Sequence, residues 1–335
     1  MSTTVRNTAG ESVQLSDIPF AQGGEAAVHA VPRFPGVVVK LYHSQVLQKR
    51  RDTLRAKIEA MSSDPKLVSL KQHPGLAWPR FSVFDERGQW RGYAMRKAAG
   101  VRMNILAHAM AYREQFPNLD RPAVVAYLLS LLGTLKELHT AGVMIGDFNL
   151  ANFLCDPNSD TVTLIDCDSW QVNAAGKTFR CPVAAPDMLA PELQGKELGK
   201  VNRTLESEYF SLAILLFKAL MLGRHPYDVV GGAGPVENIR KGYFPYGQGG
   251  GGIPKGPWFN IWSHLPFKLK EQLIGTFKEG ALNASARTSI PEWIDVLKLY
   301  QRELGKGWHD TQIKPATPKT KEYRGTQSIS QPLTV

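Results

Sequence analysis

Residues 142–168 read GVMIGDFNLANFLCDPNSDTVTLIDCD and place three polar side chains in two turns on either side of a predicted hairpin. The first turn carries Asp147, and Asn152 follows it five residues later. A short apolar strand, a loop at 156–160 rich in turn-forming residues, and a return strand then lead to Asp166. Carboxylate and amide oxygens suit a divalent metal, and a free carboxylate can accept a proton. We therefore expect a metal site with an adjacent base.

Two motifs in this stretch resemble those of the protein kinase family. That family carries H-R-D-L-x-x-x-N followed by D-F-G, and here residues 145–152 read IGDFNLAN and residues 166–168 read DCD. The resemblance implies that Asp147 is the catalytic base and that Asn152 and Asp166 bind Mg²⁺, or Mn²⁺ in its place. Asp and Asn are also common turn residues. Further motifs in the family's order must decide between a site and plain turns.

A glycine turn near the N-terminus is the first of these motifs. The segment AQGGEAAV matches the kinase pattern G-x-G-x-x-G-x-V at Gly23 and Val28, and alanine replaces the other two glycines. Backbone amides in such a turn can approach phosphates without obstruction from side chains. The resemblance implies that Gly23, Gly24 and Val28 contact ATP. Taken alone, the segment is more typical of an ordinary hairpin turn.

A lysine within an apolar strand is the second motif. Lys40 interrupts the β-branched run of residues 37–42, and a buried lysine is rarely left unpaired. A helix is predicted from a Ser44 cap to about Met61, and it contains Glu59. In protein kinases the strand lysine contacts the phosphates and pairs with a helix glutamate. The resemblance therefore implies a Lys40–Glu59 pair, with Met95 of a later strand lining the nucleotide pocket. The alternatives are a Glu59 exposed on the helix surface and a Met95 that only packs in the core.

The resemblance predicts an α+β, bilobal protein-kinase-like fold. Residues 1–95 form the small lobe, 96–100 the hinge and 101–305 a larger, mainly helical lobe, while the polar residues 306–335 are expected to be a flexible tail. The small lobe is expected to be an antiparallel sheet of five strands, at 13–20, 21–31, 37–42, 78–83 and 90–95.

Later motifs follow in the same order. The residues Ala190-Pro191-Glu192 match the A-P-E that closes the kinase activation segment, and Arg287 matches the arginine that pairs with this glutamate. The chain resembles most closely a bacterial Ser/Thr-type group in which DFG becomes D-x-D-S and P-E-L-Q-G closes the segment. Members of that group often occur beside a metal-dependent protein phosphatase and a von Willebrand A-type protein. The resemblance implies these two proteins as partners.

Composition argues against a membrane-spanning or nucleic-acid-binding protein. The 335 residues are 43% hydrophobic and 21% charged, as in an ordinary globular protein, and no apolar run is long enough to span a membrane. The net charge of +10 arises mainly in residues 1–100, without the interleaved aromatic residues of a nucleic-acid surface. Three cysteines without metal spacing and the absence of a signal sequence indicate a cytoplasmic protein with reduced thiols.

The leading hypothesis is an ATP- and Mg²⁺-dependent protein kinase that phosphorylates Ser or Thr hydroxyls, with Asp147, Lys40 and Asn152 as its catalytic residues. Two positions on the acceptor side depart from the family, because Asn149 replaces the usual lysine and Ala185 the usual threonine. A small-molecule phosphotransferase of the aminoglycoside-kinase kind is the alternative enzyme, since it shares the G-D-x-x-x-x-N and I-D-x-D patterns. A nucleotide-binding pseudokinase scaffold is the non-catalytic alternative.

Overall fold

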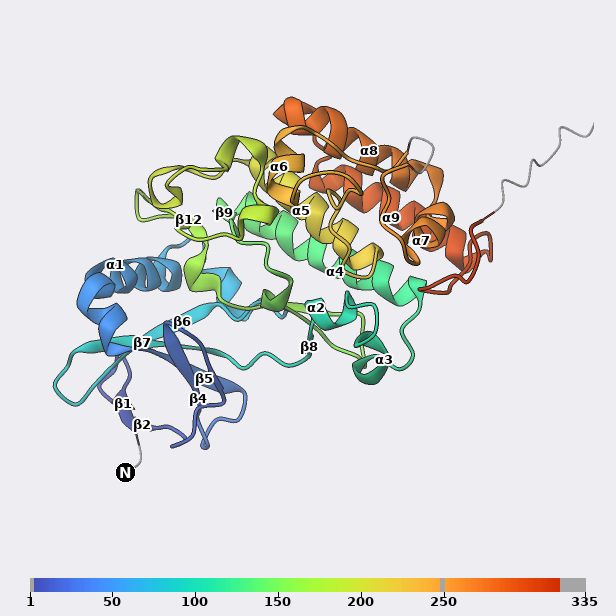
Figure 1. The fold of residues 1–335 in the computed structure, drawn as a ribbon. Coiled ribbons are helices and arrows are strands. Elements are labelled where there is room, and N and C mark those ends of the chain that lie inside the picture. Colours follow the sequence, from blue (N-terminus) through green and yellow to red (C-terminus); the bar gives the residue numbers. More distant parts are fainter. Residues whose placement is uncertain (1–2, 248–250, 320–335) are drawn as a thin grey trace, which may run out of the picture.

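The computed structural model describes residues 3–247 and 251–319, and its sheet-rich part adjoins a mainly helical part (Figure 1). The strands are β1 (Thr4–Arg6), β2 (Ser12–Gln14), β3 (Ala21–Gln22), β4 (Ala26–Ala30), β5 (Val37–Tyr42), β6 (Pro79–Phe84), β7 (Trp90–Arg96), β8 (Val101–Arg102), β9 (Val143–Met144), β10 (Phe153–Cys155), β11 (Val162–Leu164), β12 (Gln171–Ala174) and β13 (Lys177–Phe179). The α-helices are α1 (Ser44–Ser63), α2 (Met103–Leu106), α3 (Tyr112–Gln115), α4 (Arg121–Thr140), α5 (Leu205–Leu220), α6 (Pro235–Arg240), α7 (Trp258–His264), α8 (Phe267–Leu282) and α9 (Ile290–Gly305). Short 3₁₀ turns are η1 (Val68–Gln72), η2 (Leu150–Asn152), η3 (Cys167–Ser169), η4 (Pro186–Met188), η5 (Pro191–Leu193), η6 (Leu198–Lys200) and η7 (Ala284–Ala286).

The large sheet has seven strands in the order β2-β1-β6-β7-β5-β4-β3, and every pairing is antiparallel. The prediction of five strands is therefore wrong, because the β1–β2 hairpin extends the sheet beyond β6. The strand predicted at 13–20 is also wrong. Its start belongs to β2 at one edge, whereas the strand beside the glycine turn is β3 at the other edge. Pro19, which has no backbone N–H to donate, lies between them.

The added hairpin covers the outer face of this sheet. Val5 of β1 and Leu15, just after β2, are 3% and 2% exposed. They pack in a small cluster with Val39, Val83 and Ala94 from the central strands. Burying a side chain of this size contributes about 1.5–3 kcal/mol. The hairpin thus protects a face that would otherwise be open to water.

Helix α1 is a long helix packed on the sheet-rich part, where its buried side chains Leu47, Leu54, Ile58 and Met61 face inward. The indole of Trp78 donates to the Met61 carbonyl at 3.0 Å and attaches the end of the helix to the start of β6. The helix was predicted to be capped by Ser44. Instead the capping position is His43, whose side chain makes no capping hydrogen bond.

The helical part is organised around α4 and α5. Asp120 caps α4 by accepting a hydrogen bond from the Ala123 amide at 2.9 Å, and leucines recur along the buried length of the helix. Helix α5 begins with a reciprocal capping box between Thr204 and Ser207 and is buried on nearly all sides. No helix in the described ranges has both the length and the apolar character needed to cross a bilayer.

Residues 306–319, which were predicted to be flexible, pack back onto the helical part. The buried guanidinium of Arg121 donates to the carbonyls of Leu220 at 2.9 Å and Ile313 at 2.8 Å. Asn260 of α7 donates to the Ala316 carbonyl at 2.8 Å. The prediction of a flexible tail is wrong here because buried donors need these backbone acceptors. The rest of the predicted tail, 320–335, lies outside the described residues.

Candidate active site

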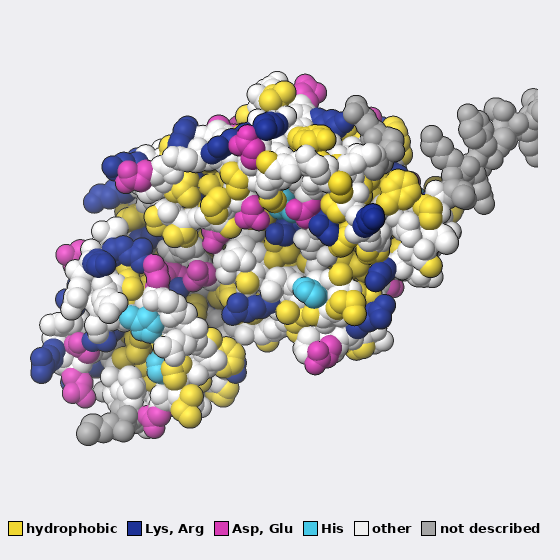
Figure 2. All heavy atoms as spheres, in the orientation of Figure 1, with side chains coloured by type: hydrophobic (Ala, Val, Ile, Leu, Met, Phe, Trp, Pro, Cys, Tyr) yellow, Lys and Arg dark blue, Asp and Glu magenta, His cyan; other side chains and the backbone are white. Residues whose placement is uncertain are grey.

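Lys40 lies on β5 at the junction of the two parts, opposite Val28 of β4 and Tyr93 of β7. Its Nζ donates to Asp166 Oδ1 at 2.5 Å and to the Asp168 oxygens at 2.7 and 2.9 Å. Burial lowers the pKa of Lys40, but the two carboxylates outweigh it and raise the pKa above its ordinary value. Acidic side chains also show on the surface near this junction in Figure 2.

Asp168 is buried and is held by the sheet-rich part. The hydroxyl of Tyr93 donates to its Oδ1 at 2.8 Å, and the hydroxyl of Tyr42 donates to its Oδ2. Burial raises the pKa of Asp168, but Lys40 and these hydroxyls hold it below its ordinary value. Sequence reasoning gave this residue no role of its own, although the D-x-D pattern contained it.

Asp166 differs from Asp168 in exposure and in backbone geometry. Its side chain is 44% exposed, against 6% for Asp168. It follows β11 with φ of 65°, in the left-handed region that non-glycine residues rarely adopt. Partial burial and the charge of Asp168 raise the pKa of Asp166, although Lys40 acts in the opposite direction. Burial is thus the main cause of the raised pKa of Asp166.

The predicted hairpin is confirmed, and it places Asn152 near Asp166. Strands β10 and β11 pair antiparallel, with Phe153 opposite Leu164. The Ile165 amide donates to the Asn152 carbonyl at 3.0 Å. Asn152 and Asp166 thus flank the same end of the hairpin, as the spacing of the motif predicted.

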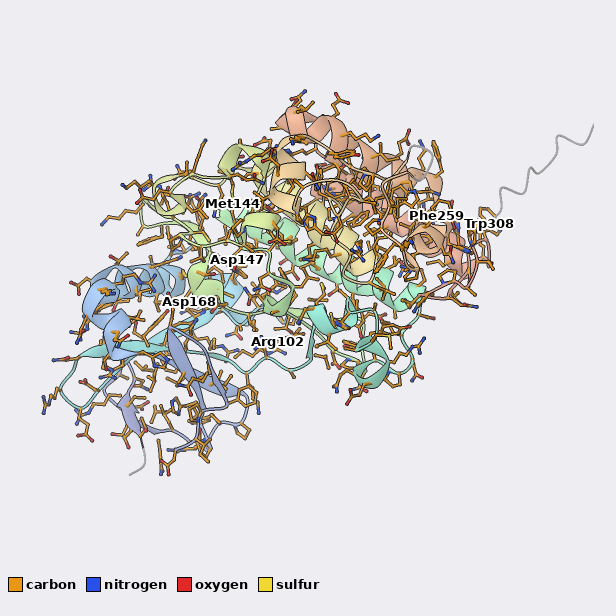
Figure 3. The ribbon with its side chains drawn as sticks, in the orientation of Figure 1. Arg102, Met144, Asp147, Asp168, Phe259 and Trp308 are labelled. Carbon is orange, nitrogen blue, oxygen red and sulfur yellow. The ribbon has the colours of Figure 1, made fainter. Side chains whose placement is uncertain are left out.

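Asp147 lies in a turn whose backbone is hydrogen-bonded to a glutamate of α5. Both carboxylate oxygens of the buried Glu208 accept backbone hydrogen bonds, from Ile145 at 2.8 Å and Gly146 at 2.7 Å. Asp147 Oδ1 is buried and has no hydrogen-bond partner among the described residues. Burial raises the pKa of Asp147, the Ala185 amide lowers it and the Asp166 charge raises it further. Figure 3 shows Asp147 and Asp168 at the junction of the two parts.

Arg203 fills the space beside Gly146 and was missed by sequence reasoning. A Cβ at Gly146 would lie 2.8 Å from Cys181 and 3.1 Å from Arg203 Nε. Arg203 is 3% exposed, and its amide donates to Gln171 Oε1 at 2.7 Å. The family motif has arginine where this chain has Gly146. The absence of a side chain at position 146 is the sequence signal that another residue could occupy this space.

The structure does not bring Glu59 to Lys40, so the predicted pair is wrong for this arrangement. Glu59 is 43% exposed and accepts from Arg55 Nε at 2.8 Å, one helical turn away. The side of α1 that faces the site carries Lys57 instead. Lys57 is buried and donates to the Trp170 carbonyl. Helical periodicity explains the result, because Ile58 and Met61 must face the core.

The glycine turn and Met95 are where the sequence predicted them to be. Gly23 donates to the Ala26 carbonyl at 2.9 Å between β3 and β4, and both glycines are exposed. A Cβ at Gly24 would meet no atom within 4 Å among the described residues. Met95 is buried near the end of β7, opposite Val38. The contacts of these residues with a nucleotide remain predictions.

The predicted pair between Arg287 and Glu192 is present. Two guanidinium nitrogens donate to the two Glu192 oxygens at 2.7 and 2.8 Å. The Arg287 side chain is 2% exposed, and it also donates to the carbonyls of Gly280 and Glu206 at 2.7 and 3.0 Å. This two-point geometry is the strong form of an arginine–carboxylate contact. It ties the segment after the site to the distal helices.

Two curated relatives of the chain come from strains of Escherichia coli. The chain is 28% identical over 316 residues to "Protein kinase YegI" of Escherichia coli O157:H7, a match that covers 91% of this chain and 47% of that protein. It is also 28% identical over 318 residues to "Protein kinase YegI" of Escherichia coli strain K12, covering 91% and 48%. No family model matches the chain.

These similarities support a kinase-like family for this chain. The chain spans about half the length of the curated relatives it matches. What those longer proteins do as a whole therefore enters only as a proposal.

Proposed function

We propose that this protein is an ATP- and Mg²⁺-dependent protein kinase with a bilobal protein-kinase-like fold, and that it transfers the γ-phosphoryl group to Ser or Thr hydroxyls. The observation that carries the proposal is the convergence of Lys40, Asp147 and Asp166. They come from β5, from the turn after β9 and from the end of the β10–β11 hairpin, and Lys40 contacts Asp166 at 2.5 Å.

The residues at the junction fit a metal and a triphosphate. Asp166 is partly exposed and has a raised pKa, so a cation beside it would stabilise its charged form. Asp166 and Asn152 would hold Mg²⁺ together with phosphate oxygens, because Mg²⁺ usually takes only one or two protein carboxylates. Lys40 would bind the phosphates, and Gly23, Gly24, Val28 and Met95 would enclose the nucleotide. When bound, Mg²⁺-ATP supplies the phosphoryl group and neutralises its charge.

Asp147 would bind and orient the acceptor hydroxyl and take its proton. Its buried Oδ1 has no partner within the described part of the chain, so a hydrogen-bond acceptor is free at this position. Its raised pKa makes it a better base than an ordinary aspartate. The turn that carries it is fixed by the Glu208 contacts to two amides. Positioning of this kind is most of what phosphoryl transfer requires.

The Glu192–Arg287 pair supports a protein acceptor over a small molecule. In the resemblance this pair belongs to protein kinases, and the two-point contact at 2.7 and 2.8 Å reproduces it. The metal-dependent phosphatase and the von Willebrand A-type protein are proposed as partners on the resemblance alone. Co-purification with each would test them.

Incubation of the purified chain with labelled ATP and Mg²⁺ tests the proposal. One set of reactions contains a protein mixture and the other contains aminoglycosides and amino alcohols. We expect label in protein Ser or Thr residues and none in the Asp166→Ala variant. Label in a small molecule alone would favour the aminoglycoside-kinase alternative. Tight ATP binding without transfer to either set would favour the pseudokinase alternative.

A further inference from the structure

Asp168 has no remaining capacity to bind a metal ion. A carboxylate offers about four lone-pair positions, and here all four are used. Oδ1 accepts from Lys40 at 2.7 Å and from Tyr93 at 2.8 Å. Oδ2 accepts from Lys40 at 2.9 Å and from Tyr42. The side chain is 6% exposed, so a hydrated ion has no approach to it.

Asp166, two residues earlier, shows the opposite pattern. Its side chain makes one hydrogen bond within the described residues, from Lys40 to Oδ1, and it is 44% exposed. Two acidic residues of one motif therefore have separate surroundings. Asp168 is buried and fixed by side chains of the sheet-rich part, whereas Asp166 is partly exposed at the junction of the two parts.

We propose that Asp168 is a positioning residue that holds Lys40 toward the nucleotide phosphates, in the place where the resemblance expected a helix glutamate. This inference rests on the proposed function. A two-oxygen contact fixes the direction of the ammonium group more firmly than a single hydrogen bond does. The two tyrosines fix Asp168 in turn, from the same strands that flank or carry Lys40.

The charges on α1 agree with this assignment. The helix presents Lys57 to the buried site, and Lys57 donates to the Trp170 carbonyl, two residues after Asp168. A glutamate on that face would add a third acid beside Asp166 and Asp168. With Lys57 the group contains two lysines and two aspartates, of which Asp166 is partly exposed. Helix α1 is thus attached to the segment that carries Asp168 rather than to Lys40.

Binding of ATP to the full chain, measured by calorimetry with EDTA and again across a Mg²⁺ titration, separates the two acids. We expect Asp168→Asn to weaken metal-free ATP binding at least tenfold and to leave the Mg²⁺ midpoint unchanged. Asp166→Asn is expected to remove the enhancement by Mg²⁺ and to change metal-free binding less than threefold. Glu59→Gln, the matched control on α1, is expected to change neither quantity.

A double-mutant cycle shows whether Asp168 acts through Lys40. In the Lys40→Met background, Asp168→Asn should weaken ATP binding by less than twofold. A tenfold loss that persists there would overturn the inference, as would a shifted Mg²⁺ midpoint in Asp168→Asn alone. If Asp168→Asn does not fold, Tyr93→Phe retains the carboxylate and should weaken metal-free binding two- to fivefold. An unchanged affinity in that variant would also count against it.

A readout without nucleotide keeps this inference distinct from the proposed function. Acylation of Lys40, followed by mass spectrometry, should be at least threefold faster in Asp168→Asn, because the amine loses its two-oxygen partner. The rate should not change in Glu59→Gln. If the wild type binds no ATP, the proposed function fails, while a faster Lys40 acylation would still support the contact. Equal rates in Asp168→Asn and wild type would show that Asp168 does not hold Lys40.

Discussion

Asp147 carries a buried carboxylate oxygen without a partner in the described ranges, whereas Asp168 uses every acceptor position it has. Replacing Asp147 by Asn keeps the shape of the side chain and removes the proposed base. We expect Asp147→Asn to bind ATP within threefold of wild type and to lose at least about 100-fold in turnover. Calorimetry and a phosphoryl-transfer assay measure the two quantities. Wild-type turnover in this variant would assign the proton to another group.

In the proposed function, Lys40 binds the nucleotide and Asp166 the metal, and neither side chain belongs to the apolar core. Lys40→Met and Asp166→Ala should each abolish phosphoryl transfer. The Asp166→Ala variant should melt close to wild type because its side chain is 44% exposed. Turnover and thermal unfolding are measured on the same samples. An active Asp166→Ala variant with unchanged melting would remove this residue from the metal site.

Gly146 sits where no side chain fits. Its φ is 70°, and a Cβ there would lie 2.8 Å from Cys181. Gly146→Ala should therefore lower the free energy of unfolding by about 1–3 kcal/mol. Gly176→Ala is the matched control, since its φ is 72° and the described structure leaves its Cβ position open. Chemical denaturation measures the free energy of unfolding of the two variants. An equal decrease in both would show that the positive φ, and not the contact with Cys181, causes the loss of stability.

At this scale the sequence predicted positions that depend on chain neighbours. Asn152 and Asp166 lie at the same end of the β10–β11 hairpin, while the roles assigned to them and to Asp147 stay predictions. Glu59 was wrong because the pairing depended on which face of α1 turns inward, and Ile58 and Met61 decide that. Arg203 could not be found, since it reaches Gly146 from a segment far along the chain.

Among the elements, the 3₁₀ turn η3 bears on control by phosphorylation. Ser169 Oγ donates to the Asp166 carbonyl at 2.9 Å, so a phosphate there would disrupt the turn beside the site. Thr178 Oγ1 donates to Asn173 Oδ1 at 2.8 Å on the exposed β12–β13 hairpin. Arg180, which follows this hairpin, donates from Nε to Asn202 Oδ1 at 2.8 Å, so its guanidinium is already engaged.

We therefore expect that neither Ser169 nor Thr178 is an activating phosphorylation site. Activity is measured before and after phosphatase treatment and in Ser169→Ala and Thr178→Ala, with sites mapped by mass spectrometry. A tenfold loss on dephosphorylation, about 1.4 kcal/mol of barrier, traced to either residue would show the prediction to be wrong.

The Glu192–Arg287 contact gives stability a specific dependence on pH. Burial raises the pKa of Glu192, but Arg287 outweighs it and the pKa is lowered from 4.5. A carboxyl with a lowered folded pKa stabilises the fold above its unfolded pKa, and this contribution is lost as pH falls through the folded value. Glu192→Gln should thus melt lower than wild type at pH 7, and the difference should shrink below pH 4.5. A constant difference across this range would contradict the assignment.

Elements with a long pattern were predicted well, and short ones were not. Helix α1 and the β10–β11 hairpin lie close to their predicted positions. The β1–β2 hairpin consists of strands of three residues each, too short to show an alternating pattern. Its place at the edge depends on Val5 and Leu15 packing against strands distant in sequence.

At the scale of the whole molecule, the segment after α9 packs back onto the helical part and contacts the buried Arg121. The guanidinium of Arg121 depends on the Leu220 and Ile313 carbonyls, and composition alone gave no sign of this contact. A chain ending at Trp308 loses one of these acceptors, and it should unfold at about 1.5–3 kcal/mol lower free energy because a hydrogen bond to a charged donor and the burial of Ile313 are lost. A chain ending at Lys319, which keeps the contact, is the control. Equal free energies of unfolding for the two chains would mean that the packing of this segment, including the Arg121–Ile313 contact, does not stabilise the fold.

The three cysteines are fully buried, one in each region around the site. Cys155 lies in β10, Cys167 between the two acids of the D-x-D motif, and Cys181 beside Gly146. Burial raises the pKa of Cys155 to about 12, so its thiolate does not form at neutral pH. Each thiol can be labelled only after its own element opens. The three thiols can thus report local opening. The rate at which an alkylating reagent modifies each one measures how often the surrounding segment opens to solvent.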